Sequence, residues 1–415
     1  MDITFQGREW SWVPEPLHQH QHRGQYCQSS FGFITLTNKY SRTPTTPQSE
    51  SPKPTSSQNP AAINVSSTTP IPGELTERDV KFAFICREIF EYDAMLDALD
   101  FVGTHFPWDG RYGSVPYRWG YINGHLVVVT ALSEQGRADV AIVATNLKDN
   151  FPGIHLIVLV GTCSAAPYNP TTRNQDPIML GDVIFSTQVQ HYLKGAHLGN
   201  HLNTINTIPQ DTCDQKILRL MRMAQSRIDR RELKQLTEKE FETLRLKDNS
   251  YKYPDPHTCR DILYRPYYPH VHRDFTCSEP NRDKKCNLTL SAACSAARKA
   301  SCRELNCDRS HAKRVRQNDN TEFSIHWGIF ASGEVEMGNA VLRDCIASSD
   351  QMCAFETEAS GMWRGGPALI IKGASDYADN HNGDGWKTYA AGRAACSAKA
   401  LVLQCWPNSL RTSWV

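Results

Sequence analysis

The sequence predicts one large α/β domain, a three-layer α/β/α sandwich around a mixed β-sheet, with a helical and loop-rich insertion. Three apolar runs carry this prediction, at residues 82–86, 155–160 and 368–371. None of them alternates with polar residues, which is typical of strands buried on both faces, and segments with helical periodicity separate them. A chain of 415 residues is long enough for one such domain with additional segments.

The composition argues against several kinds of partner. Lys and Arg number 45 against 44 for Asp and Glu, and a net charge of +1 indicates neither nucleic acid nor an anionic membrane. No apolar run approaches the roughly 20 residues that cross a bilayer. The first residues lack the basic segment and apolar core of a secretory signal. We therefore expect a cytoplasmic protein, whose 14 irregularly spaced cysteines are reduced thiols packed as small hydrophobes.

The predicted domain spans residues 77–408 and is preceded by a segment of different character. Residues 1–76 include a stretch dense in Ser, Thr and Pro, which cannot bury enough apolar surface to offset its ordering entropy. We expect this segment to be disordered, and residues 409–415 to form a short C-terminal tail. The histidines at 18, 20 and 22 have a metal-binding composition, but we favour a solvated polar tract over a metal site.

The domain is expected to begin with a strand at residues 82–86 and a helix over residues 87–99, with Glu91 just past the strand. A hairpin should follow, because Asn123-Gly124 separates two β-rich runs and is a strong signal for a tight turn. Residues 137–150 then have the periodicity of an amphipathic helix.

The next apolar strand, residues 155–160, is expected to end in a turn of small residues at 161–167. Small residues after a buried strand let the backbone approach a ligand closely, although many such turns are plain strand–helix connections. Another strand is expected at residues 180–186.

The regular order loosens in an insertion at about residues 191–322. Two charged amphipathic helices are expected at 217–227 and 232–246, followed by a loop-rich piece that contains many Tyr and Pro residues. Six cysteines lie between Cys259 and Cys307. A zinc site drawn from Cys277, Cys286, Cys302, Cys307 and His311 is conceivable. No C-x-x-C pair exists and the spacings fit neither a zinc ribbon nor a finger, so we expect no metal and no cofactor.

The last third of the chain places acidic residues at the ends of predicted elements. A strand is expected at residues 325–333, and Glu356 and Glu358 stand at the start of a helix pattern. The apolar run 368–371 carries Ser375 and Asp376 to the carboxyl end of a strand, where ligands bind in open α/β sheets. The plainer interpretation is that Glu358 favours the first turn of a helix and that Asp376 caps the next element. A helix over residues 387–403 closes the domain.

The pattern E-x-E-A at residues 356–359, followed by a strand that ends S-D-x-x-D at 375–379, resembles the nucleoside phosphorylase and nucleosidase superfamily. The resemblance is closest to the fungal branch with a long insertion, and it covers about residues 82–403. Residues 180–186 resemble the L-G-D-V-V-x-S strand of that family, and the last helix resembles its W-x-x-Y-A-A pattern. The chain departs from the family at Ser164 and Ala165, where glycines are usual.

The resemblance implies an enzyme that cleaves the N-glycosidic bond of purine nucleosides. Glu358 would bind the ribose hydroxyls, and Asp376 would handle the proton at N7 of the purine, with Ser375 orienting its loop. Thr357 stands where a methionine commonly packs under the ribose. Ser332 belongs to the turn that contacts the substrate, and Glu334, Val335 and Glu336 match positions that line the base in relatives, where Glu336 replaces the usual aromatic or apolar contact. Assemblies of identical subunits are usual in the family, and we expect one here.

The attacking group distinguishes hydrolysis from phosphorolysis. Nucleosidases of the family place a Glu just beyond the first strand to activate water, and Glu91 matches that position. Gly161 and Thr162 match the turn that touches the ribose and holds this water. Lys372 stands where an assisting arginine is usual, so charge is kept but bidentate geometry is lost. Since a carboxylate would repel phosphate, hydrolysis is favoured, although the same Glu91 would suit the first turn of any helix.

Two other functions stay open at the level of sequence. One is a phosphate-dependent purine nucleoside phosphorylase. The other is a catalytically degenerate module that binds a nucleoside or serves in signalling, which the replaced glycines at 164 and 165 favour.

Overall fold

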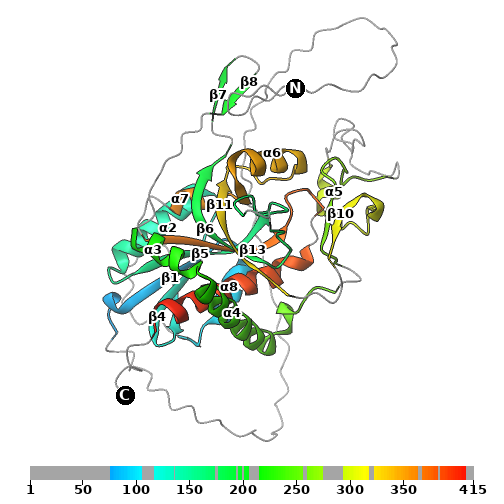
Figure 1. Cartoon of the computed structure of the whole chain (residues 1–415). Coiled ribbons are helices and arrows are strands. Elements are labelled where there is room, and N and C mark those ends of the chain that lie inside the picture. The colour runs from blue at the N-terminus through cyan, green and yellow to red at the C-terminus, as the bar shows by residue number, and fades with distance from the viewer. Residues whose placement is uncertain are drawn as a thin grey trace, which may run out of the picture. The chain divides into compact units, whose positions relative to one another are not determined.

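The structure is a computed structural model of the chain (Figure 1). It describes residues 75–104, 116–134, 136–172, 176–192, 215–255, 259–273, 293–316, 322–362, 367–381 and 384–407, and the backbone of residues 195–198 and 201–204. Of the predicted tail 1–76, residues 1–74, with the histidines at 18, 20 and 22, lie outside these ranges, and so does the predicted C-terminal tail 409–415. None of the described helices combines the length and the apolar character that a membrane crossing requires.

The described chain alternates strands and helices as an α/β fold does. The strands are β1 Val80–Cys86, β2 Phe101–Val102, β3 Arg118–Ile122, β4 His125–Ala131, β5 Leu156–Ala165, β6 Val183–His191, β7 Gly195–Leu198, β8 His201–Thr204, β9 Ile262–Tyr264, β10 Ala312–Val315, β11 Ile325–Ser332, β12 Met352–Glu356 and β13 Ala368–Asp376. The helices are α1 Ile89–Ala98, α2 Arg137–Asn150, α3 Gln215–Ala224, α4 Arg227–Lys247, α5 Ser295–Lys299, α6 Ala340–Asp350, α7 Ala359–Met362 and α8 Lys387–Cys405.

One mixed sheet organises the domain. Its strand order is β12-β11-β6-β13-β5-β1-β4-β3-β2. The apolar strands β1, β5 and β13 run parallel at its centre, while β6 and β13 pair antiparallel. The predicted mixed sheet of buried strands is therefore confirmed, because the unbroken apolar runs take its central positions.

The sheet also closes partly on itself, which the predicted sandwich did not include. Strand β12 pairs with β11 and, antiparallel, with β5, so that β12, β11, β6, β13 and β5 form a ring. The closing pairs are Ala354 with Ala165 and Phe355 with Ser164. A flat middle layer between two layers of helices is thus an incomplete description of this fold.

The ring closes because β5 is longer than its apolar run. The prediction of a turn at residues 161–167 is wrong for residues 161–165, which continue strand β5. Gly161 to Cys163 pair with β13, and Ser164 and Ala165 pair with β12. Small residues fit this crowded junction, where two ladders meet on one strand. The residues that replace the family's usual glycines therefore lie in a strand and not in an open turn.

Helix α8 covers the central strands and is buried along most of its length. It packs against β13, β5, α1 and α4, and Figure 1 shows α4 and α8 side by side below the sheet. The approach to β13 is close, because a Cβ on Gly373 would lie 2.2 Å from the Ala390 carbonyl oxygen. The alanines of α8 provide the small surface that this approach needs.

Several other elements match their predictions closely. The hairpin of β3 and β4 turns at Asn123 and Gly124, both in the left-handed region with φ of 51° and 76°. Helix α2 has the predicted bounds, and α3, α4 and α8 differ from theirs by three residues or fewer except at the start of α4. The prediction missed α6, β12 and the short pairs β7–β8 and β9–β10.

Candidate active site

A pocket of about 500 Å³ lies where β5, β12 and β13 end. Segments from the whole chain contribute to it, including the end of β1, the loop after β11 and the start of α8. Its lining residues are Arg87, Thr162, Cys163, Ser164, Ala293, Arg298, Glu336, Met337, Gly338, Phe355, Glu356, Thr357, Ser375, Asp376, Asn380 and Lys387. Of the predicted site residues, this pocket thus brings together Thr162, Thr357, Ser375 and Asp376.

Asp376 is the last residue of β13 and is held on both oxygens. Its Oδ1 accepts the backbone N–H of Ala378 at 2.9 Å, and its Oδ2 accepts the Ser375 hydroxyl at 3.0 Å. The Ser375 hydroxyl also lies 3.3 Å from the carbonyl oxygen of Cys163, which can accept the same hydrogen in place of Asp376. Ser375, the preceding residue of the same strand, therefore helps to orient the Asp376 carboxyl at the pocket.

Glu91 lies behind the pocket, beneath Thr162. Its Oε1 accepts the backbone N–H of Thr162 at 2.6 Å and the Thr162 hydroxyl at 2.8 Å. Its Oε2 accepts the backbone N–H groups of Arg87 and Glu88 at 3.0 and 3.1 Å. The side chain is 2% exposed, and these four bonds occupy about all the lone pairs that a carboxylate offers.

Gly161 makes room for the Glu91 carboxyl. A Cβ at residue 161 would lie 2.3–2.4 Å from the carboxyl atoms of Glu91. Any other residue here would push the carboxylate away from Thr162. The sequence predicted that Gly161 contacts the substrate. In the structure Gly161 does not line the pocket, and its lack of a side chain makes room for Glu91.

Lys372 is a fully buried cation that no described group binds. It lies beside Gly161 in the pairing of β13 with β5, and its Nζ has no hydrogen-bond partner among the described residues. Burial opposes its charge, but the carboxylates of Glu91, Glu358 and Glu356 outweigh burial and raise the pKa of Lys372. A buried ammonium with free N–H donors indicates a place for a water molecule or a ligand atom.

The two acids of the E-x-E motif differ in position. Glu356 lines the pocket, and its Oε2 accepts the backbone N–H groups of Glu358 and Ala359 at 2.8 and 2.7 Å, which caps α7. Its Oε1 has no partner among the described residues. Burial, and next the charge of Glu358, raise the pKa of Glu356 to about 7, although Lys372 opposes this.

Glu358 is 1% exposed and lies behind the lining of the pocket. The hydroxyl of Thr357 donates to its Oε1, and the guanidinium of Arg87 lies 3.5 Å from the same oxygen. Burial disfavours the charge of Glu358, but Lys372 and Arg87 outweigh burial and hold its pKa below the ordinary value. The predicted ribose carboxylate is thus ionised and partly covered by a cation.

Arg87 is a charged residue of the candidate site that the sequence prediction missed. It follows the last residue of β1, lines the pocket, and pairs with Glu88, Glu336 and Glu358 at 3.0, 3.4 and 3.5 Å. The sequence offered one signal that Arg87 lies at the site: it stands directly after a predicted buried strand and four residues before Glu91. Two other cations, Arg298 and Lys387, line the same pocket.

The two remaining predicted residues lie outside the pocket lining. The Ser332 hydroxyl accepts the backbone N–H of Ser360 at 3.0 Å, which joins β11 to α7. The Val335 side chain is 68% exposed, and its carbonyl accepts the Tyr192 hydroxyl. The neighbouring residues Glu336, Met337 and Gly338 line the pocket in their place.

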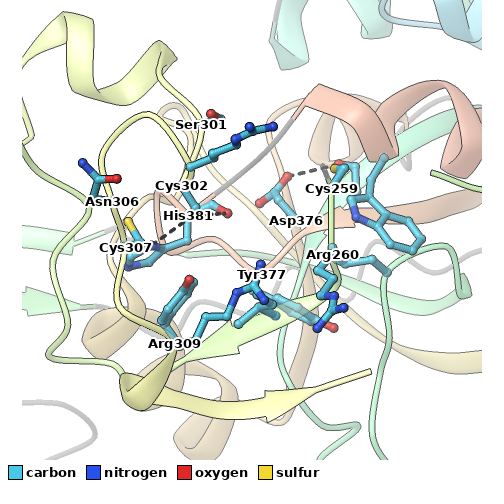
Figure 2. Close-up of a pocket in the computed structure, with 16 residues that line it drawn as sticks. Cys259, Arg260, Ser301, Cys302, Asn306, Cys307, Arg309, Asp376, Tyr377 and His381 are labelled. Atoms are coloured by element: carbon cyan, nitrogen blue, oxygen red, sulfur yellow. Dashed lines mark hydrogen bonds between the residues drawn. The ribbon is translucent and has the colours of Figure 1, made fainter. Parts of the chain in front are cut away.

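A second pocket of about 310 Å³ shares Ser375 and Asp376 with the first (Figure 2). The one group of metal-ligand type found among the described residues lies at its edge: His270, Cys302, Cys307 and His381. The active-site candidate and this group are therefore neighbours, joined by the loop that follows β13.

Comparisons with known proteins give distant likenesses. No family model matches the chain. A nucleotide-binding leucine-rich repeat (NLR)-like protein of Hyaloscypha variabilis is 22% identical over 347 residues, which cover 81% of this chain and 30% of that protein. The chain thus spans less than a third of the length of the curated relative that it matches.

Solved structures with a similar fold include a nucleosidase and a futalosine hydrolase. A 5′-methylthioadenosine/S-adenosylhomocysteine nucleosidase from S. pneumoniae has a TM-score of 0.43 and 14% identity, covering 78% of this chain and 98% of its own. The futalosine hydrolase of Helicobacter pylori has a TM-score of 0.43 and 11% identity, covering 79% of this chain and 99% of its own. Likenesses at this level do not establish an activity for this chain.

Proposed function

We propose that the chain hydrolyses the N-glycosidic bond of a purine nucleoside. The observation that carries this proposal is that Asp376 and Thr162 line one pocket, while Glu91 is bonded to Thr162 and the unpaired Nζ of Lys372 belongs to the residue paired with Gly161, next to Thr162. Hydrolysis needs a proton donor for the base and an activated water on the other side of the sugar carbon. Asp376 would supply the first, and Glu91 with Thr162 and Lys372 would supply the second.

Asp376 would neutralise the departing base. When the bond from C1′ to the base breaks, its electron pair moves to the base, and a proton on N7 relieves the charge. Asp376 is anchored by Ser375 and by the N–H of Ala378 at the end of a rigid strand. A carboxyl held in this way would already be oriented toward the base, so proton transfer would need no prior change of rotamer.

Glu91 would take the proton from the attacking water. Its four hydrogen bonds leave no lone pair for water, but one of them comes from a hydroxyl that can rotate. If the Thr162 hydroxyl turned toward the pocket, Glu91 Oε1 would accept from a water molecule and Lys372 Nζ would donate to it. The water oxygen would then bond to C1′ while its proton passed to Glu91.

Thr357 and the two acids of the E-x-E motif would hold the sugar. Glu356 offers an unpaired Oε1 at the pocket, and Glu358 offers an ionised carboxylate behind Thr357. One carboxylate can accept from two vicinal hydroxyls, which supports the role of Glu358 if Arg87 moves aside. Glu336, Met337 and Phe355 would contact the base or the rest of the substrate.

Phosphorolysis is the second candidate, and three lining cations favour it. Arg87, Arg298 and Lys387 would attract phosphate. Arg87, however, already faces three carboxylates, and Glu91 and Glu356 would repel the anion.

A module that binds without catalysis is the third candidate. It is favoured by the saturated hydrogen bonds of Glu91 and by the Arg87 guanidinium beside Glu358. Both features block groups that a nucleosidase needs.

Product analysis tests the three candidates together. The full chain is incubated with a panel of purine nucleosides, with and without phosphate, and the free base and sugar are identified by mass spectrometry. We expect free ribose at a rate that is independent of phosphate, that falls by roughly a hundredfold or more in Asp376→Asn and that is kept in Glu242→Gln, a matched change on the exposed face of α4. Ribose 1-phosphate would overturn hydrolysis, and binding without any product would identify the module.

A further inference from the structure

We propose that His270, Cys302, Cys307 and His381 bind one structural zinc ion, which joins the insertion to the loop that follows Asp376. The four ligand atoms lie within 4.8 Å of one another. Figure 2 shows three of them, Cys302, Cys307 and His381, grouped at the edge of the pocket that Asp376 also lines. The proposal stands independently of the reaction proposed above.

Four of the six distances between the donor atoms are close to the edges of a zinc tetrahedron, and the other two are within 4.8 Å. Zinc bonds of about 2.3 Å to sulfur and about 2.0–2.1 Å to nitrogen imply edges of about 3.3 Å between nitrogens and about 3.6 Å between nitrogen and sulfur. The Nδ1 atoms of His270 and His381 lie 3.3 Å apart. The distances from sulfur to nitrogen are 3.5 Å for Cys307 and His270, 3.6 Å for Cys302 and His381, and 3.8 Å for Cys302 and His270.

The second nitrogen of each imidazole supports the same assignment. His270 Nε2 lies 2.9 Å from the carbonyl oxygen of Ala300, and His381 Nε2 lies 2.9 Å from that of Tyr268. Because a carbonyl only accepts, both Nε2 atoms carry the hydrogen. Both Nδ1 atoms then have a free lone pair, and these lone pairs converge. Backbone carbonyls orient the histidine ligands of zinc in this manner.

The two cysteines belong to a tight turn that holds their sulfurs. The backbone N–H of Cys307 donates to the carbonyl of Cys302 at 2.8 Å, and Asn306 takes the left-handed conformation with φ of 51°. Arg273 reaches the turn from outside, with Nη1 2.9 Å from the Leu305 carbonyl and 3.5 Å from the Cys307 sulfur. A cation beside the sulfur favours a thiolate, which is the form that binds zinc.

Around this turn, the part of the insertion that the structure describes has little core of its own. Its separate buried cluster consists of Cys294, Ala297 and Leu305. Segments with so few buried apolar residues commonly depend on a metal or a disulfide for their structure. Four protein ligands of the type Cys₂His₂ leave no open position on the ion, which indicates a structural and not a catalytic zinc.

The ion would fix the loop after β13. His381 lies five residues beyond Asp376, and between them Ala378 and Asn380 have φ of 55° and 62°, a conformation that costs free energy for residues other than glycine. A bond from His381 to the metal would hold that loop against the insertion. The earlier expectation of no zinc relied on local spacing, and this cluster draws its ligands from segments 111 residues apart.

Metal analysis of the purified full chain tests the proposal. We expect about one zinc per chain by mass spectrometry of the metals, less than a tenth of that in Cys302→Ser and in His381→Ala, and full content in two matched controls. The controls are Cys345→Ser on the exposed face of α6, and His311→Asn, which lies near the cluster but is not one of its four ligands.

A second measurement keeps the test decisive if a ligand variant fails to fold. Metal-free wild-type chain is titrated with cobalt(II) and then with zinc, while absorption and thiol reactivity are followed. We expect thiolate-to-cobalt absorption at one equivalent, its loss on adding zinc, and two thiols protected per chain. The proposal is overturned if the chain takes up no metal, if Cys302 and Cys307 are found as a disulfide, or if the zinc leaves only when the histidines at 18, 20 and 22 are replaced.

Discussion

Replacing Glu356 by Gln is expected to remove the part of the pH dependence of the free energy of unfolding that comes from this carboxyl. Burial raises the pKa of this carboxyl from its ordinary value of 4.5 to about 7. Between these two values the folded protein holds a proton that the unfolded chain has released. The stability contributed by this proton is therefore complete below pH 4.5 and is lost as pH rises through about 7.

The size of the effect follows from the same two values. A pKa difference of one corresponds to about 1.4 kcal/mol, so the ionised Glu356 lowers the free energy of unfolding by about 3 kcal/mol at pH 8. Gln has nearly the shape of the protonated acid, and its carbonyl oxygen can still accept from Glu358 and Ala359. We expect Glu356→Gln to equal the wild type in stability near pH 4.5 and to exceed it by up to about 3 kcal/mol at pH 8.

Urea unfolding at several values of pH between 4.5 and 8 measures this difference directly. Glu242→Gln, an exposed change on α4, serves as the control and should follow the wild type at every pH. If the free energy of unfolding of Glu356→Gln fell with pH in parallel with that of the wild type, the carboxyl would not carry the raised pKa. A variant that is less stable at pH 8 would likewise refute the reasoning.

Three further outcomes are expected. Gly161→Ala should lower stability by about 1–3 kcal/mol in a thermal melt, because its Cβ would lie within 2.4 Å of the Glu91 carboxyl; a variant as stable as wild type would contradict this. Arg87→Ala should lower the Kd for a nucleoside in calorimetry, because it uncovers Glu358; weaker binding would show that Arg87 itself contacts the ligand. Deleting residues 1–74 should leave the Tm nearly unchanged, whereas a drop of many degrees would reveal a docked segment.

The central sheet could be predicted because its signals are local. An unbroken apolar run such as 368–371 predicts a buried strand wherever it lies, and Asn123-Gly124 predicts its own turn. The ring closure could not be predicted, because it depends on pairing between Ser164 and Phe355, which are far apart in the chain. Local sequence does not encode which strand edges meet.

In the candidate site, too, residues with a local sequence signal could be predicted, and residues brought together only by the fold could not. Asp376 and Thr162 could be placed because each follows a recognisable strand pattern. Arg87 was missed because the carboxylates that it pairs with at the pocket lie far along the chain. Of the positions 334–336, which the resemblance placed at the base, Glu336 lines the pocket and Val335 does not. The histidine and cysteine cluster has no spacing signature, because the fold alone brings His270 and His381 together.

The most direct test of the proposed hydrolysis compares two substrates in two variants. Initial rates are measured for a purine nucleoside and for a riboside of p-nitrophenol, whose leaving group needs no proton. We expect Asp376→Asn to slow the purine nucleoside by roughly a hundredfold or more, the usual scale for a general acid, and the nitrophenyl riboside far less. Glu91→Gln should slow both substrates alike, because it acts on water. Equal losses for both substrates in Asp376→Asn, or a Glu91→Gln variant as fast as the wild type, would contradict the assignment of the two carboxylates.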